Sequence, residues 1–240
     1  MSGCDLSRYT SGHKCNNTSK IMSEKTAAIV GSTGMIGAYL TEMLLKDDYF
    51  STVRLIVRRP IEKSHPKIEI KLVDFNDAES LKLALEGTDA LFCCIGTTNK
   101  NVKGDKELYR KIDYDIPVNS ARFAKEVGCE TMAIVSAIGA NSKSGTFYLK
   151  LKGEVEDKLQ TIGLRSVYIM QPCMLLGDRK ENRPLERVLQ VASKVVAGIL
   201  PAKYKPIHGK TVAAAMLNVV KLGKSGFFKY TYKEIMSLAG

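Results

Sequence analysis

The chain has 240 residues, of which 45% are hydrophobic and 25% are charged, and its formal net charge at pH 7 is +11. This length suits one sizeable core, and no apolar run approaches the 18 residues of a membrane span. Lysine and arginine are spread along the chain without a run of five. We therefore expect a basic surface that favours anionic ligands, with no specific nucleic-acid recognition.

The N-terminal segment and the cysteines indicate the cellular compartment. Residues 1–24 are polar and read as a disordered arm without the apolar stretch of a secretory signal. A mitochondrial transit peptide is the alternative, because acids are few, but Arg8 is the sole arginine there. The six cysteines contain no C-x-x-C pair, which favours reduced thiols. We expect a cytoplasmic protein.

From residue 26 to residue 170 most of the predicted strands are separated by predicted helices. Parallel strands need such helical crossovers, so the pattern predicts an α/β fold with a doubly wound Rossmann sheet. Pro117 lies inside the third helix and should kink it. The predicted strands are 26–30, 51–57, 68–73, 90–95, 131–137 and 165–170, and the predicted helices are 38–45, 78–85, 106–127 and 146–162.

After Cys173 the strict alternation stops. Helices are expected over 185–200 and 210–222, with short strand-like pieces near Ile207 and over 227–231. We expect this part to form a small substrate-side cap at the carboxyl edge of the sheet. The predicted organisation is a disordered arm (1–24), a Rossmann domain binding NADP(H) (25–172) and a cap packed on the same domain (173–240).

A glycine-rich turn joins the first strand to the first helix. Gly31 permits a tight turn, Gly34 lets the backbone approach a pyrophosphate, and Gly37 lets the helix pack on the strand. The free N–H groups at the start of the helix favour an anion there. The turn predicts dinucleotide binding, and an ordinary glycine-rich βα turn is the alternative.

Arg58 and Arg59 follow the second strand, where an NAD-binding fold usually places an acid for the ribose 2′-hydroxyl. A guanidinium pairs bidentately with a 2′-phosphate. The two arginines therefore predict NADP(H) as the cofactor, unless they are simply solvated loop residues.

Ser136, Tyr148 and Lys152 form the candidate catalytic group. Tyr148 and Lys152 are four residues apart, so both project from one face of a helix. A neighbouring ammonium favours the phenolate form of a tyrosine, which helps it to exchange protons near neutrality. Ser136 would hold a carbonyl oxygen while Tyr148 moves the proton, and Lys152 would also bind the nicotinamide ribose.

The glycine turn with Ser136, Tyr148 and Lys152 resembles the short-chain dehydrogenase/reductase superfamily, in its extended or atypical branch. Over residues 26–222 the chain is more closely similar to the HIV Tat-interacting protein family of oxidoreductases. The stretches that carry this likeness are Arg58-Arg59, Val73–Phe75, Phe92–Thr98, Tyr148–Glu156 and Leu175–Arg179.

The resemblance implies the rest of the cofactor site. The implied contacts are Ser32, Thr33, Gly34, Met35 and Ile36 at the pyrophosphate, Asp74 and Phe75 at the adenine, Ile95, Gly96, Thr97 and Thr98 along the ribose side, and Gln171, Pro172 and Cys173 at the nicotinamide. Asp113 stands where extended relatives carry an asparagine that anchors a relay water. An ionised carboxylate accepts but does not donate, which places that relay in question.

The primary prediction is an NADPH-dependent reductase of small carbonyl compounds, with no bound metal. A nucleotide-gated interaction protein that engages a protein partner with little turnover is the main alternative, and a cofactor-retaining isomerase or dehydratase is the third. We expect a monomer or a homodimer.

Overall fold

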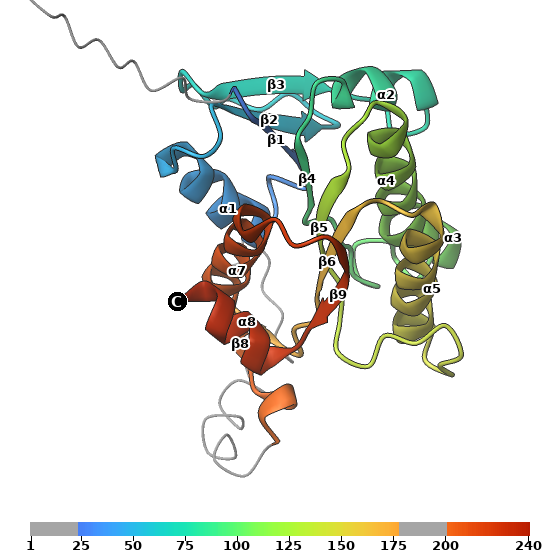
Figure 1. Cartoon of the computed structure of the whole chain (residues 1–240). Coiled ribbons are helices and arrows are strands. Elements are labelled where there is room, and N and C mark those ends of the chain that lie inside the picture. The colour runs from blue at the N-terminus through green and yellow to red at the C-terminus, as the bar shows by residue number, and fades with distance from the viewer. Residues whose placement is uncertain (1–23, 178–200) are drawn as a thin grey trace, which may run out of the picture.

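Seven parallel strands form the sheet, in a computed structural model that describes residues 24–177 and 201–240 (Figure 1). Their order is β3-β2-β1-β4-β5-β6-β9, and every neighbouring pair is parallel. The strands are β1 (Thr26–Val30), β2 (Thr52–Val57), β3 (Ile68–Leu72), β4 (Ala90–Cys93), β5 (Thr131–Val135), β6 (Ser166–Met170) and β9 (Gly226–Tyr230). The predicted doubly wound Rossmann sheet is confirmed, and its order reverses between β1 and β4.

Helices cover both faces of the sheet (Figure 1). One face packs against α1 (Met35–Lys46), α7 (Gly209–Leu222) and α8 (Tyr232–Ala239). The other packs against α2 (Ala78–Leu85), α4 (Ile116–Glu126) and α5 (Phe147–Ile162). Because both faces are covered, the central strands are largely apolar, and β1, β4 and β6 are buried at every position.

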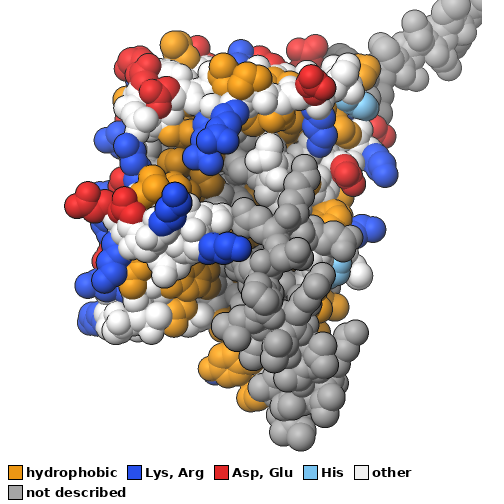
Figure 2. All heavy atoms as spheres, turned by 180° about the vertical axis from the view of Figure 1, so that it is seen from behind, with side chains coloured by type: hydrophobic (Ala, Val, Ile, Leu, Met, Phe, Trp, Pro, Cys, Tyr) orange, Lys and Arg blue, Asp and Glu red, His pale blue; other side chains and the backbone are white. Residues whose placement is uncertain are grey.

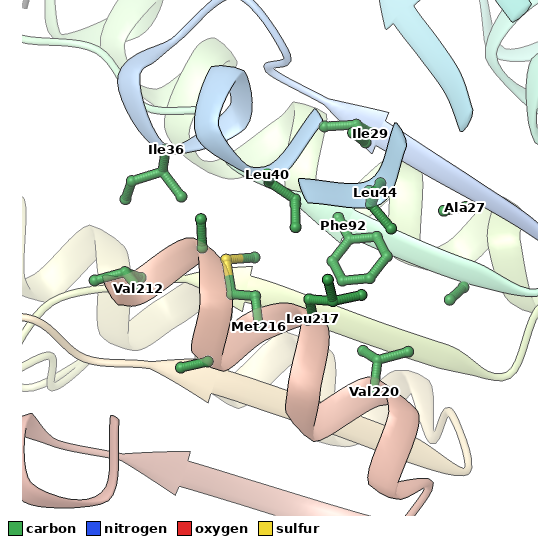
Figure 3. Packing of buried hydrophobic residues seen from close by; sticks show 14 of the residues in the cluster. Ala27, Ile29, Ile36, Leu40, Leu44, Phe92, Val212, Met216, Leu217 and Val220 are labelled. Atoms are coloured by element: carbon green, nitrogen blue, oxygen red, sulfur yellow. The ribbon is translucent and has the colours of Figure 1, made fainter. Parts of the chain in front are cut away.

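Side chains of α1 and α7 interlock above the centre of the sheet (Figure 3). Leu40 and Leu44 of α1 and Met216 of α7 are fully buried together with Phe92 of β4. Each such side chain contributes roughly 1.5–3 kcal/mol on leaving water. This layer fixes the position of α1, whose first turn carries the glycine motif.

The C-terminal segment extends the sheet, which differs from the predicted cap. Helix α7 is a crossover that returns the chain to β9, which pairs in parallel with β6 over its whole length. The β9 segment begins with Gly226 and carries Lys229, so it lacks the apolar run of a central strand. Its pattern therefore favoured a short strand within the cap instead of a strand of the main sheet.

Between β6 and α7, the described residues form a small unit beside α1. Two short parallel strands, β7 (Leu175–Leu176) and β8 (Ile207–His208), pair with each other, and η2 (Ala202–Tyr204) precedes β8. A Cβ on Gly177 would lie 2.7 Å from the Met35 sulfur, so this unit contacts the glycine turn. The arm predicted at the N-terminus and the helix predicted over 185–200 lie outside the described residues, except for Glu24.

The predicted helix over 106–127 is divided into three parts. A short α3 (Lys106–Arg110) leads into a π-helical turn (Lys111–Asp115), after which α4 begins. Pro117 has no N–H to donate to Asp113, the residue four positions earlier, and its ring crowds that carbonyl. The predicted kink is thus a change of helical pitch, which turns Asp113 into the interior.

Figure 2 shows the face opposite to that of Figure 1. On its described part, Lys and Arg side chains alternate with acidic and apolar ones instead of gathering in one stripe. No helix in the described part of the chain is long and apolar enough to cross a membrane.

Candidate functional site

The glycine turn lies at the reversal of the sheet, where backbones approach very closely. Gly31 has φ +89°, and a Cβ there would lie 2.8 Å from the carbonyl carbon of Cys94. A Cβ on Gly37 would lie 2.2 Å from the Gly31 carbonyl oxygen. No larger side chain fits either position without moving β1, β4 or α1.

The start of α1 has the features of an anion site. Gly34 is the N-cap and offers no side chain to the first-turn N–H groups, and no acid lies in that turn. The Ser32 hydroxyl is buried without a hydrogen-bond partner among the described residues. Free N–H groups, a helix dipole and an unpaired hydroxyl fit a dinucleotide pyrophosphate. Thr33 is exposed, and Met35 and Ile36 begin the helix.

The cofactor residues predicted after the other strands lie at the same carboxyl edge. Arg58 and Arg59 are exposed just beyond β2. Asp74, beyond β3, accepts hydrogen bonds from the N–H and the side-chain amide of Asn76 at 2.9 and 2.8 Å. Phe75 packs against the core on the α2 side. The structure thus brings the predicted adenine-side residues to one edge of the sheet.

The loop after β4 is anchored by Asp113. The strand ends at Cys93, two residues earlier than predicted, so Ile95, Gly96, Thr97 and Thr98 belong to the loop. The Thr97 N–H donates to Asp113 Oδ2 at 2.7 Å, and the Tyr109 hydroxyl donates to the Thr97 carbonyl at 3.2 Å. Asp113 therefore anchors the backbone of this loop.

The second oxygen of Asp113 pairs with the predicted catalytic lysine. Lys152 Nζ lies 3.0 Å from Asp113 Oδ1, and both side chains are buried. Burial lowers the pKa of the Lys152 ammonium, but the carboxylate of Asp113 and the nearby Tyr148 outweigh it and raise that pKa to about 12. Tyr148 is 38% exposed one turn earlier on α5. The structure thus places Tyr148 near Lys152, and Asp113 is a third residue of this group.

Ser136 lies just after β5 and is engaged elsewhere. Its hydroxyl donates to Glu156 Oε1 at 2.5 Å, and Glu156 also accepts from the Gln171 side chain. Pro172 follows, and its carbonyl accepts from the Ile138 N–H at 3.1 Å. The prediction missed Glu156 as a site residue, although it lies on the helical face of Tyr148 and Lys152, where a glutamate needs a buried partner.

Cysteines and metal ligands contribute little to the site. The four described cysteines are free thiols, and burial raises the pKa of Cys93 to about 11. Burial also raises the pKa of the Cys173 thiol, so it is not activated as a nucleophile. Among the described residues no group of three or more His, Cys, Asp or Glu is placed to hold a metal ion.

These features define a Rossmann protein with a dinucleotide site at the reversal of its sheet. Residues 31–221 match the family model described as NAD(P)H-binding, and the chain belongs to that family. It is 33% identical to Protein HTATIP2 of Rattus norvegicus over 203 residues, which cover 82% of this chain and 81% of that protein. The predicted resemblance to Tat-interacting oxidoreductases is confirmed.

One further relative supports the family, and one solved structure supports the fold. The mitochondrial Protein FMP52 of Debaryomyces hansenii is 34% identical over 200 residues, 81% of this chain and 87% of that protein. A UDP-N-acetylglucosamine 4-epimerase from Bacillus cereus has the same fold, with a TM-score of 0.64 and 20% identity over 89% of this chain and 83% of that chain.

The Gly37→Ala variant should disrupt the glycine turn. Because the added Cβ would lie 2.2 Å from a backbone oxygen, we expect a loss of stability of about 1–3 kcal/mol and a loss of NADPH binding. Urea unfolding and NADPH fluorescence titration measure both. Gly145→Ala is the control, because no atom lies within 4 Å of its added Cβ. Equal behaviour of the two variants would contradict the assignment.

The Asp113→Asn variant should leave a buried ammonium without its partner, at a cost of about 3–5 kcal/mol in the free energy of unfolding. The raised pKa of Lys152 means that its pairing stabilises the fold below pH 10.5 and that this contribution is lost as the pH rises through about 12. Without Asp113, burial lowers the pKa of Lys152 in the variant. The difference between the variant and the unsubstituted protein should therefore be largest near neutrality and shrink progressively as the pH rises toward about 12.

Urea unfolding between neutral pH and pH 11.5 checks this expectation. Asp115→Asn, two residues away in the same π-helical turn, is the matched control. A difference that does not change with pH would show that Asp113 acts only through Thr97.

Proposed function

We propose that the chain is an NADPH-dependent oxidoreductase of the short-chain type, which reduces a small carbonyl compound. The observation that carries the proposal is the placement of Tyr148 and Lys152 on one face of α5, with Lys152 buried and linked through Asp113 to the loop after β4. Bound NADPH supplies the hydride. Tyr148 donates the proton to the carbonyl oxygen, and its partial exposure lets solvent return that proton.

The main role of Lys152 is to position the groups around it. Its ammonium is balanced by the Asp113 carboxylate 3.0 Å away, so the pair adds no net charge beside Tyr148. Ser136 is expected to hold the carbonyl oxygen by resemblance, although its proton is directed to Glu156 here.

The Tyr148→Phe variant tests the reaction. Removing the hydroxyl should lower kcat by about 10²–10⁴-fold, because general acid catalysis contributes that much, and should leave NADPH affinity nearly unchanged. The measurement is NADPH consumption over a panel of aldehydes and ketones. Tyr114→Phe, whose aromatic ring stacks with Arg110 on the far side of α5, is the control. Unchanged turnover in Tyr148→Phe would rule out this mechanism.

Arg58 and Arg59 support NADP(H) over NAD(H). Replacing both by alanine should weaken NADPH binding by about 10–100-fold and leave NADH binding almost unchanged, because hydrogen bonds to a charged phosphate would be lost. The chain contains no tryptophan, so cofactor fluorescence can be titrated directly. Lys63→Ala removes a nearby exposed charge as a control. Equal affinity of the unsubstituted protein for both cofactors would overturn this assignment.

A second candidate is a cofactor-gated binding protein with little turnover. The pairing of Lys152 with Asp113 and of Ser136 with Glu156 favours it, because both candidate catalytic groups are already engaged. Cofactor-dependent capture of a protein partner that survives loss of Tyr148 and Lys152 would support it. A cytoplasmic location and a monomer or homodimer stay predictions, and the relatives named FMP52 are mitochondrial.

A further inference from the structure

Glu156 is a buried carboxylate that the reaction above does not use. It is 1% exposed and lies on α5 one turn after Lys152 and two turns after Tyr148. All three side chains therefore project from one face of the helix. A buried carboxylate is costly unless it is fully hydrogen-bonded and balanced by a cation.

Among the described residues, each hydrogen-bond or ion-pair partner of the Glu156 carboxylate is a donor. Ser136 Oγ donates to Oε1 at 2.5 Å, and Gln171 Nε2 donates to Oε1 and Oε2 at 2.9 and 3.1 Å. Lys229 Nζ lies 2.7 Å from Oε2. The carboxylate oxygens accept each of these contacts. Lys229 balances the charge.

The donors come from the ends of three adjacent strands. Ser136 follows β5, and its N–H donates to the Met170 carbonyl at the end of β6. Gln171 follows β6, and its N–H donates to the Tyr230 carbonyl at the end of β9. Lys229 belongs to β9 itself. Glu156 thus joins α5 to the side chains at the carboxyl edge of β5, β6 and β9.

We propose that Glu156 is a positioning residue for this edge of the site, and that Lys229 balances its charge from the edge strand β9. Its effect on turnover rests on the proposed function, whereas its coupling to Lys229 does not. Because the Ser136 hydroxyl donates to Glu156, it must release Glu156 before it can donate to a carbonyl oxygen. While that bond holds, the proton for a carbonyl oxygen comes from Tyr148.

The charges around Glu156 make the role of Lys229 specific. Lys152 lies one turn earlier on α5, but Asp113 of the π-helical turn already neutralises it. Among the described residues, Lys229 of β9 is the cation paired with Glu156. A buried carboxylate that loses its cation binds a proton at a higher pH than an exposed one.

The Lys229→Met variant tests the proposal through activity. We expect NADPH affinity to stay within about twofold and kcat to fall by about tenfold, the effect of weakening hydrogen bonds to a charged group. The loss should be larger at acid pH, where Glu156 becomes protonated and must release one of its donors. Lys229→Arg should restore the activity and the pH profile of the unsubstituted protein. Lys158→Met, an exposed lysine of α5, is the matched control.

Urea unfolding gives a readout that needs no turnover. In Lys229→Met, Glu156 binds its proton more tightly in the folded chain than in the unfolded chain. Relative to the unsubstituted protein, the variant should therefore lose stability as the pH rises from 5 to 8. Adding Glu156→Gln should abolish that pH dependence, because no titrating group remains in the pair.

The outcomes separate this proposal from the proposed function. If the unsubstituted protein reduces no carbonyl compound, the proposed function fails, but the pH-dependent unfolding of Lys229→Met still tests the coupling. If Lys229→Met matches Lys158→Met in kcat, pH profile and unfolding, the positioning role of Glu156 is overturned.

Discussion

The structure depends on a backbone contact that no side chain can enter. At the reversal of the sheet, Gly31 and Gly37 bring β1, β4 and α1 so close that an added Cβ would overlap main-chain atoms. This contact sets where α1 begins, and so where its free N–H groups point. It also sets where the chain leaves β4, because the Cys94 N–H donates to the Val30 carbonyl at 2.8 Å. The loop that Asp113 holds starts from that point.

One face of helix α5 places charged side chains in the interior, and two ion pairs neutralise them. Asp113 pairs with Lys152, and Glu156 pairs with Lys229. A buried ion pair adds little stability over apolar packing, but loss of one partner is costly, so such pairs fix geometry more than they add stability. The two pairs tie α5 to different parts of the site: one reaches the loop after β4, the other reaches β9.

The sequence allowed the sheet and the cofactor edge to be predicted because both follow from local patterns. Apolar runs gave β1 to β6, and glycine spacing gave the phosphate turn. The predictions failed where partners are distant in sequence. Nothing near Lys229 indicates that β9 joins the sheet beside β6, and nothing near Asp113 names Lys152 as its partner. Likewise, Ser136 looked free for a ligand because Glu156 lies a helix away along the chain.

The packing of α1 on α7 bears on how the chain is made. Leu40 and Leu44, encoded near the beginning, are covered by Val212, Met216 and Val220, which are encoded near the end (Figure 3). During synthesis the first βα unit therefore leaves the ribosome well before the helix that shields it. Contacts of such long sequence separation form slowly and leave apolar surface exposed meanwhile. Until α7 emerges, the apolar face of α1 lacks the helix that covers it, so the layer that fixes the start of α1 is completed late in synthesis.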